Sequence, residues 1–353
     1  MRQMRSKGIG IVVSLVLWVV SIQHIEACTR VLHLFKKEGL VMTARSMDWY
    51  IRYPSTLWKF PRGMKRDGLT KDNPAHWTSR YASLAVVQTA DGQSATADGI
   101  NEKGLVANLL YLTETEYPAR DTKIPGVASS IFLQYLLDNY ATVAEAVKAL
   151  QNGEIQIVPV PIPNSEHLPT MHIALSDASG DSAIIEFLGG ESIIHHNRNH
   201  QVMANSPIFE KQLALTAYWD AIGDLFLPGT RRSPDRFVRA DYYNRRLPEP
   251  KDYREAVASL LSIIRNVSSP FGEPDPKKPN ISTTMWRVLH DQTNLRLFYE
   301  STVAPNVIWV EMRELNLSAG APVEKLLLEE PILSGDVTKR FVESEPLKFA
   351  RPR

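Results

Sequence analysis

One stretch decides how the whole chain is interpreted: residues 24–49, which read HIEACTRVLHLFKKEGLVMTARSMDW. It contains Cys28, the only cysteine among 353 residues. The segment before Cys28 resembles a removable leader, and the segment after it predicts a β-hairpin that turns at Glu38-Gly39. We predict that a peptidase cuts between Ala27 and Cys28. Cys28 would then begin the processed chain, carrying both a thiol and a free α-amine.

A cysteine at the amino terminus combines two groups that support nucleophilic catalysis. An ordinary thiol, with a pKa near 8.5, is only slightly ionised at neutral pH. An α-amine titrates at roughly 7.7–8.0, so it accepts and returns the thiol proton near pH 7. Nucleophile and base would then belong to one residue. The alternative is an inert buried side chain, which is the commoner role of a lone cysteine.

Residues 1–27 have the three parts of a secretory signal peptide. The start is basic, residues 9–22 are mostly apolar, and Ala27 offers a small residue at the cut. The apolar run is short for a bilayer span, and no second run of about 20 apolar residues follows. We expect an exported protein, periplasmic or secreted, without stable membrane insertion after signal removal. The alternative is a lipoprotein with a lipidated Cys28, although Glu26 fits that recognition pattern poorly.

The composition is that of a globular protein, with 44% apolar and 22% charged residues. Residues 1–27 hold three of the 40 Lys and Arg and one of the 39 Asp and Glu, so the remainder has a formal net charge of −1. That balance argues against nucleic acid or an anionic membrane as a partner. We expect residues 28–353 to form one catalytic domain without an internal disulfide.

Hydrophobic periodicity predicts many strands in antiparallel succession, with helices grouped between them. Strands are expected in a hairpin over residues 29–43 and at 84–89, 105–112, 171–176, 182–188, 191–195, 201–204, 283–288, 295–300 and 307–311. Helices are expected at 129–140, 142–150, 209–219, 234–243 and 253–264, with Thr142 and Ser233 as N-terminal caps. Asp98 and Gly99 are assigned to a turn. The pattern favours a layered α+β fold over βαβ winding.

Six short motifs occur in the order found in a known family. They are CTR (28–30), ARSMDW (44–49), NEKGL (101–105), NSP (205–207), LPG (227–229) and RFVR (236–239). Together they resemble the choloylglycine hydrolase family of conjugated bile salt hydrolases and penicillin V acylases, and most of all its Gram-negative branch. The resemblance implies an N-terminal nucleophile hydrolase with a four-layer αββα fold, in which two antiparallel sheets are stacked between helices. It also implies the cut before Cys28, a homotetramer, and a reaction without metal or cofactor.

The resemblance assigns roles to residues around the cysteine. Arg45 favours the thiolate through its charge, and Asp48 orients the α-amine. Asn205 supplies its side-chain amide to an oxyanion hole, and Tyr111 supplies its backbone N–H. Arg236 matches the family's distal arginine. The alternatives from the residues alone are a surface ion pair for the first two, a turn asparagine before proline, and a core aromatic for Tyr111.

Neighbouring residues compete for two of these roles. Asn108 lies three residues before the predicted backbone donor, and Arg239 lies one helical turn after the predicted arginine. Trp49, Trp58 and Tyr111 are predicted to form an aromatic wall for an aryl or long acyl group, with core packing as the alternative. The histidines at 195, 196 and 200 have no cysteine or carboxylate at ligand spacing, so we predict no metal site there.

These observations predict an exported hydrolase of a small-molecule amide, with Cys28 as its nucleophile. Penicillin V, acyl-homoserine lactones and glycine- or taurine-conjugated bile acids all present the required linkage, and the aromatic candidates favour the first two. Bile salt hydrolase activity is the alternative within the family. N-acylethanolamine or ceramide-type amidases fit less well, because they mature by a cut within a longer chain. The alternative from another class is a lipid-anchored, non-catalytic binding protein on the same fold.

Overall fold

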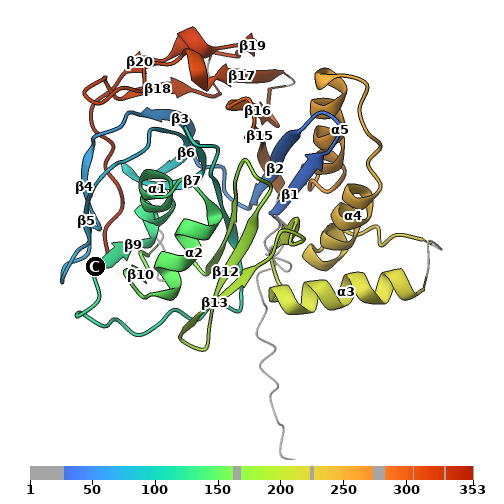
Figure 1. The fold of residues 1–353 in the computed structure, drawn as a ribbon, viewed down its shortest axis with the longest axis horizontal. Coiled ribbons are helices and arrows are strands. Elements are labelled where there is room, and N and C mark those ends of the chain that lie inside the picture. Colours follow the sequence, from blue (N-terminus) through green and yellow to red (C-terminus); the bar gives the residue numbers. More distant parts are fainter. Residues whose placement is uncertain are drawn as a thin grey trace, which may run out of the picture.

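A computed structural model describes residues 28–161, 168–222, 226–272, 283–304, 306–329 and 331–352. The predicted signal peptide lies outside the described residues. Two large sheets are stacked face to face, with helices on both outer surfaces (Figure 1). Met42 and Ala44 from one sheet and Val86 and Ile100 from the other are fully buried in a common apolar cluster. This arrangement confirms the α+β class and the αββα layering.

The first sheet has seven strands in the described residues, and the hairpin that follows Cys28 supplies its second and third strands. In spatial order the strands are β14 (Val202–Ala204), β1 (Thr29–Phe35), β2 (Leu40–Trp49), β15 (Thr283–Asp291), β16 (Arg296–Ser301), β17 (Val307–Glu311) and β19 (Gly335–Asp336). Gly39 closes the hairpin at φ +63°, a left-handed conformation that glycine adopts without strain. β15 comes from the far end of the chain and pairs with β2, so both contribute to the site described below.

The second sheet has nine strands in the described residues and is split beside the site. In spatial order they are β13 (Glu191–His196), β12 (Ser182–Leu188), β11 (Met171–Ser176), β8 (Val106–Tyr111), β7 (Gln93–Asn101), β6 (Ser83–Ala90), β3 (Ser55–Phe60), β18 (Glu324–Leu327) and β20 (Val342–Glu343). β7 and β8 pair only over residues 98–100 and 106–108, and beyond these pairs the two strands separate. Two small sheets pair β4 (Lys65–Asp67) with β5 (His76–Thr78) and β9 (Gly126–Ala128) with β10 (Gln156–Val158).

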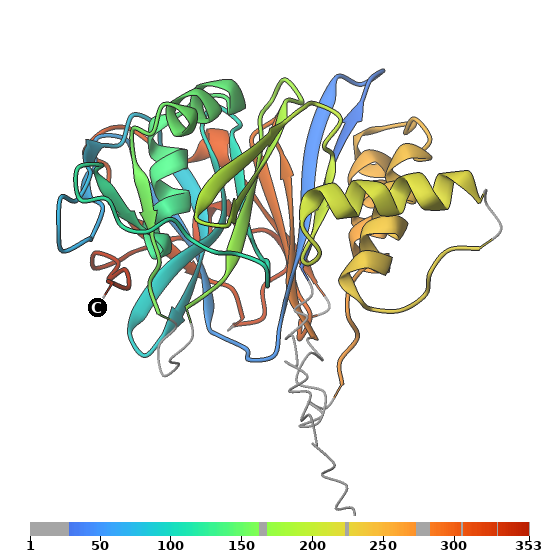
Figure 2. The same ribbon diagram turned by 90° about the horizontal axis from the view of Figure 1, so that it is seen from below.

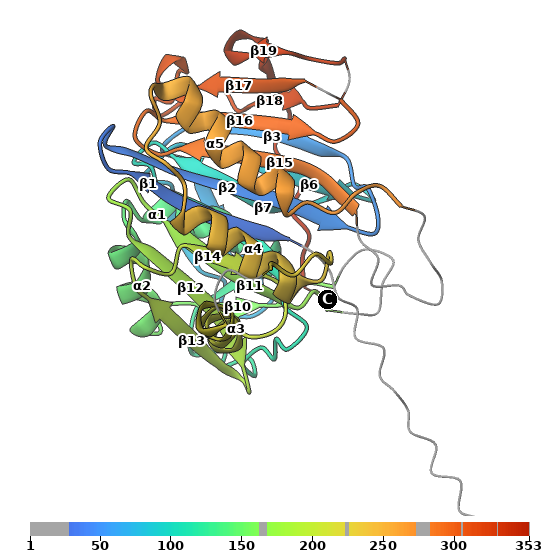
Figure 3. The same cartoon turned by 90° about the vertical axis from the view of Figure 1, so that its right-hand side faces the viewer.

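Helices form the outer layers, as Figures 2 and 3 show. α1 (Ser129–Asn139) and α2 (Val143–Gln151) cover the nine-stranded sheet, whereas α4 (Ser233–Arg245) and α5 (Tyr253–Asn266) cover the seven-stranded sheet, with α3 (Phe209–Ala221) beside α4. Short 3-10 helices form at η1 (Met312–Glu314) and η2 (Thr338–Arg340). In the described part of the chain, no helix has the length and apolar character needed to cross a membrane.

The predicted strands and helices are confirmed, but two local predictions are wrong. Thr142 caps α2 as expected, accepting from Glu145 N at 3.2 Å. Ser233 does not cap α4: it is the first helical residue, because Arg232 takes the extended cap position. Asp98 and Gly99 lie within β7 and form no turn. Gly99 is needed there for packing, since an added Cβ would come within 2.8 Å of the backbone oxygen of Leu84 on β6.

Candidate active site

Cys28 lies immediately before β1, between β2 and β14. Thr29 pairs with Ser46 on β2, which brings the next residues of β2 alongside the cysteine. The Cys28 side chain is buried, with 2% of its surface exposed. Its Sγ lies 3.6 Å from Arg45 Nη2 and 3.5 Å from the backbone N of Asp48. The hairpin therefore brings the predicted arginine and aspartate to the thiol.

Arg45 presents a fixed positive charge to the thiol. Its Nη2 also donates to Leu109 O on β8 at 2.6 Å, and its guanidinium lies 4.6 Å from the centroid of the Trp286 ring. Nη1 approaches Asp98 Oδ2 at 3.8 Å. Contacts with both sheets thus hold the guanidinium in place beside Cys28.

The surroundings of Cys28 do not ionise its thiol by themselves. Burial raises the pKa of the Cys28 thiol above its ordinary value, and the charge of Arg45 opposes the rise only in part. The thiol is therefore protonated at neutral pH in this environment. To act as a nucleophile it needs a nearby base, and an α-amine on the same residue is suited to that task.

Asp48 is a buried carboxyl behind the cysteine. Its Oδ1 accepts from Thr284 Oγ1 at 2.5 Å, and its Oδ2 lies 3.7 Å from Arg236 Nη1. Burial raises the pKa of Asp48 to about 6, while the charge of Arg236 and the Thr284 hydrogen bond oppose the rise. The alternative of an exposed ion pair with Arg45 is wrong, because both side chains are almost entirely buried.

Asn205 follows β14, and its side-chain amide forms hydrogen bonds with both Cys28 and the end of β8. Its Nδ2 donates to Tyr111 O at 2.7 Å, and its Oδ1 accepts from the backbone N of Cys28. Arg236 Nη2 approaches the same Oδ1 at 3.5 Å, while Gln212 Nε2 donates to the Asn205 carbonyl at 2.6 Å. An amide nitrogen carries two hydrogens. The second hydrogen of Nδ2 can therefore serve another acceptor.

The strand register directs the backbone of Tyr111 to this region. Tyr111 is opposite Met171 on β11, and Leu112 N donates to Thr170 O at 3.1 Å. In an antiparallel ladder this makes Tyr111 and Met171 a non-hydrogen-bonded pair. The N–H and C=O groups of Tyr111 therefore point away from β11. The Tyr111 carbonyl accordingly meets Asn205. The Tyr111 N–H lies on the same edge of β8.

Their positions show whether the competing residues, Asn108 and Arg239, lie near the cysteine. Asn108 Nδ2 donates to Asp98 Oδ2 at 2.8 Å within the interior, and its side chain does not line the pocket beside the cysteine. Arg236 Nη1 donates to Cys28 O at 2.9 Å. Arg239 instead donates to two carbonyls of the loop before α4, at 2.7 and 2.8 Å. The structure therefore brings Arg236, and not Arg239, to the cysteine.

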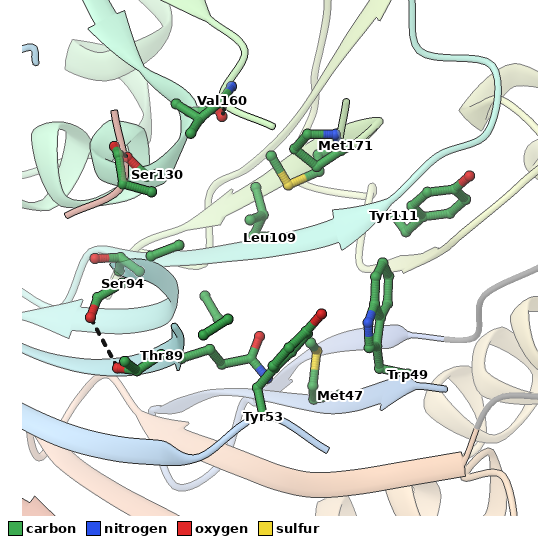
Figure 4. Close-up of a pocket in the computed structure, with 18 of the residues that line it drawn as sticks. Met47, Trp49, Tyr53, Thr89, Ser94, Leu109, Tyr111, Ser130, Val160 and Met171 are labelled. Carbon is green, nitrogen blue, oxygen red and sulfur yellow. Dashed lines mark hydrogen bonds between the residues drawn. The ribbon is translucent and has the colours of Figure 1, made fainter. Parts of the chain in front are cut away.

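An apolar pocket opens beside Cys28 (Figure 4). It holds about 940 Å³ of empty space, including its open mouth. Trp49 and Tyr111 line it, with ring centroids 6.0 Å apart in an edge-to-face arrangement. Tyr53 and Met171 add further apolar surface. A flat aromatic or alkyl group would fit such a lining.

Trp58 does not belong to this wall, and its predicted role in substrate binding is wrong. Its side chain is 5% exposed and stacks on Phe60 with ring centroids 5.8 Å apart. Its Nε1 donates to Thr56 Oγ1 at 2.7 Å. Alternation along β3 turns Leu57 toward the space between the sheets and Trp58 to the other face. The core-packing alternative holds for Trp58.

The structure adds residues that the sequence did not indicate. Thr284 bonds Asp48 from 236 positions away, and Gln212 holds the backbone of Asn205 from α3. No local pattern marks either one. Tyr53 lies four positions after Trp49, and its closeness to the ARSMDW motif is the one signal that could have indicated it.

His195, for which we predict no metal site, lies beside Glu186 near the start of α3. His195 Nε2 lies 3.3 Å from Glu186 Oε2, and Glu186 Oε1 accepts from Phe209 N at 2.9 Å at the start of α3. Although burial raises the pKa of Glu186, hydrogen bonds from His172 and His195 lower it to about 2. Among the described residues, no cluster of three or more His, Cys, Asp and Glu could hold a metal ion.

A thiol, a fixed cation, an amide donor and an apolar pocket meet in one place, a combination suited to acyl transfer. The model of the linear amide C–N hydrolases, choloylglycine hydrolase family, matches residues 28–326. The chain is 43% identical over 347 residues to a penicillin V acylase from Pectobacterium atrosepticum, a match that covers 92% of each protein. It is 31% identical over 267 residues to a bile salt hydrolase/transferase from Clostridium perfringens, covering 67% of this chain and 78% of that protein.

Solved structures are similar as well. The structure of penicillin V acylase from Agrobacterium tumefaciens matches with a TM-score of 0.84 and 45% identity, covering 92% of this chain and 100% of that chain. A conjugated bile acid hydrolase from Clostridium perfringens shares the fold, with a TM-score of 0.72 at 24% identity. The resemblance drawn from the motifs is confirmed. The chain belongs to the choloylglycine hydrolase family of linear amide C–N hydrolases.

Proposed function

We propose that this enzyme is an exported N-terminal cysteine hydrolase of the penicillin V acylase or acyl-homoserine lactone acylase type. The position of Cys28 Sγ carries the proposal. It borders an apolar pocket, lies 3.6 Å from the Arg45 guanidinium, and shares its site with the Asn205 amide. The family match that begins at residue 28 supports the cut before Cys28.

The first chemical step is attack by the thiol. The neutral α-amine of the processed Cys28 accepts the Sγ proton, and the sulfur attacks the carbonyl carbon of the bound amide. Arg45 stabilises the developing thiolate. Such a proton transfer matters because the buried thiol stays protonated at neutral pH without a base.

The second requirement is stabilisation of the tetrahedral oxyanion. The remaining N–H of Asn205 Nδ2 and the backbone N–H of Tyr111 are the proposed donors. Both donors are neutral. The bond from Asn205 Nδ2 to Tyr111 O links them, and Gln212 holds the Asn205 carbonyl, so they need little reorganisation during the reaction. Asp48 and Arg236 act as positioning residues around the Cys28 backbone.

Proton return completes the cycle. The α-ammonium gives its proton to the leaving amine nitrogen as the C–N bond breaks, which leaves an acyl thioester on Sγ. The α-amine then accepts a proton from water, whose oxygen attacks the thioester carbonyl. The tetrahedral intermediate then breaks its C–S bond, and the leaving Sγ takes the proton back from the α-ammonium, which restores the thiol and the neutral α-amine as the carboxylic acid is released. Every group in this cycle belongs to the protein, the substrate or water.

The substrate preference rests on the pocket lining. Trp49, Tyr53 and Tyr111 offer aromatic surface to a phenoxyacetyl or alkyl acyl group. Two penicillin V acylases are similar over 92% of this chain, which supports the same preference. Conjugated bile acids are the alternative substrates, because proteins named bile salt hydrolase/transferase are also related.

Hydrolysis of a small panel tests the substrate proposal. Penicillin V, a straight-chain acyl-homoserine lactone and glycocholate would be compared by kcat/KM with one purified, processed enzyme. We expect the first two to exceed the third, and the reverse order would favour the bile salt alternative.

Mass spectrometry distinguishes a free Cys28 from the lipid-anchored alternative. The proposed periplasmic or secreted location and homotetramer are tested by cell fractionation and light scattering.

A further inference from the structure

The split in the nine-stranded sheet extends the pocket from one face of the sheet to the other. Beyond their shared pairs, residues 93–97 of β7 and 109–111 of β8 separate, and residues of both segments line the pocket. On one face the lining includes Cys28 and Met47 from the opposite sheet. On the other face it includes Ser130 at the start of α1. The pocket therefore passes through the sheet between β7 and β8.

The end of the chain occupies the edge of β7 that β8 leaves free. Ser94 N donates to Lys348 O at 2.9 Å, and Ala350 N donates to Ser94 O at 2.9 Å. These bonds form a parallel bridge between Ser94 and Phe349. The segment of residues 348–350 thus lies along β7 as a short additional strand, next to the opening in the sheet.

Ala350 lies at the end of the pocket where α1 begins. It lines the pocket and is 6% exposed, and its carbonyl accepts from Ser130 Oγ at 2.6 Å. Val160 lines the same end, and its N–H donates to Ser129 Oγ at 3.0 Å. The first two residues of α1 therefore fix both parts of this end. Figure 4 shows Ser94, Ser130 and Val160 grouped away from Trp49 and Tyr111.

We propose that residues 348–350, with Ala350 at their centre, form the end wall of the acyl site and set the longest acyl chain that the enzyme accepts. The inference rests on the proposed function, because it assumes that the acyl group enters this pocket from Cys28. The family match ends at residue 326, so the wall lies outside the segment that the family model describes.

Replacing Ala350 by leucine tests the wall. The larger side chain would occupy space at the end of the pocket, where one methylene group is worth about 10–200-fold in discrimination. We expect Ala350→Leu to lower kcat/KM at least about 10-fold for the longest acyl-homoserine lactone that the wild type accepts, in a series from butanoyl to dodecanoyl. The butanoyl substrate should be nearly unaffected. Arg351→Leu is the matched control, because Arg351 is exposed and does not line the pocket.

A shortened chain tests the opposite direction. Deletion of residues 348–353 would open the far end of the pocket, and we expect acyl chains longer than the wild-type limit to become substrates. If the deletion impairs folding, the Ala350→Leu comparison still decides the question. A folded Ala350→Leu enzyme with the wild-type length profile would overturn the proposal.

Binding without turnover separates this inference from the proposed function. In a Cys28→Ala background, calorimetry would measure the affinity of straight-chain carboxylates from butanoate to dodecanoate. We expect Ala350→Leu to weaken binding of the long members and to spare the short ones. That result together with no hydrolysis of any amide would retain the wall and reject the proposed function. Affinity that is independent of chain length, or unchanged by Ala350→Leu, would reject the wall.

Discussion

Replacing Asn205 by alanine would measure catalysis and stability at one residue. The substitution removes the donor to Tyr111 O, 2.7 Å away, and the acceptor of the Cys28 nitrogen. A buried polar group left without its partner costs about 1–3 kcal/mol. We therefore expect the free energy of unfolding to fall by about 2–6 kcal/mol for the two groups together. Loss of one oxyanion donor separately lowers kcat on the order of 10²–10³-fold, about 2.7–4 kcal/mol.

The assay must separate these two effects. We would measure kcat and KM per folded enzyme together with urea unfolding on one preparation, and expect KM to change little, since the donor acts in the transition state. Asn244→Ala is the matched control. Asn244 is 2% exposed and donates to Leu32 O at 3.0 Å, so its loss should reduce stability while kcat stays constant. A kcat of Asn205→Ala equal to that of Asn244→Ala would refute the assignment of Asn205 to the oxyanion hole.

Three further predictions follow from the same site. Cys28→Ser should fold and lose at least about 10³-fold in kcat, because a hydroxyl is far harder to ionise than a thiol; near-normal turnover would remove Cys28 from the mechanism. Asp48 has a folded pKa of about 6 against an ordinary 3.8, so its stabilising contribution is present below pH 3.8 and is lost as the pH rises through 6. As the pH rises from 3.8 to above 6, the free energy of unfolding of Asp48→Asn should therefore increase by up to about 3 kcal/mol relative to that of the wild type. The same pH dependence in both proteins would contradict this. Trp49→Ala should raise KM for penicillin V about 10-fold, whereas Trp58→Phe should leave it unchanged, and equal effects of the two variants would disprove the aromatic wall as defined by Trp49, Tyr53 and Tyr111.

Local patterns predicted most of the elements because their signals lie within a few residues. The hairpin around Gly39 and the cap of α2 at Thr142 are of this kind. The turn prediction at Asp98 and Gly99 is wrong because these residue types favour turns, whereas packing against α1 and β6 fixes Gly99 and the opposite sheet meets Asp98. The partial pairing of β7 with β8 has no sequence signature at all.

The site was predictable where its residues lie on the hairpin that follows Cys28. Arg45 and Asp48 are brought to the thiol by the register of β1 and β2, which the sequence pattern specifies. Thr284 and Gln212 arrive from distant parts of the chain and could be found only in three dimensions. The prediction for Trp58 is wrong because the residue type does not tell which face of a strand points toward the pocket.

The central claim is that a free amino-terminal Cys28 carries the acyl group. One measurement tests it directly: mass spectrometry of the amino-terminal peptide after the purified enzyme is quenched in acid during turnover of penicillin V. We predict a peptide that begins at Cys28 and carries a phenoxyacetyl thioester on its Sγ. A turning-over enzyme whose peptide still includes Ala27, or whose acyl group is attached to another residue, would contradict the account.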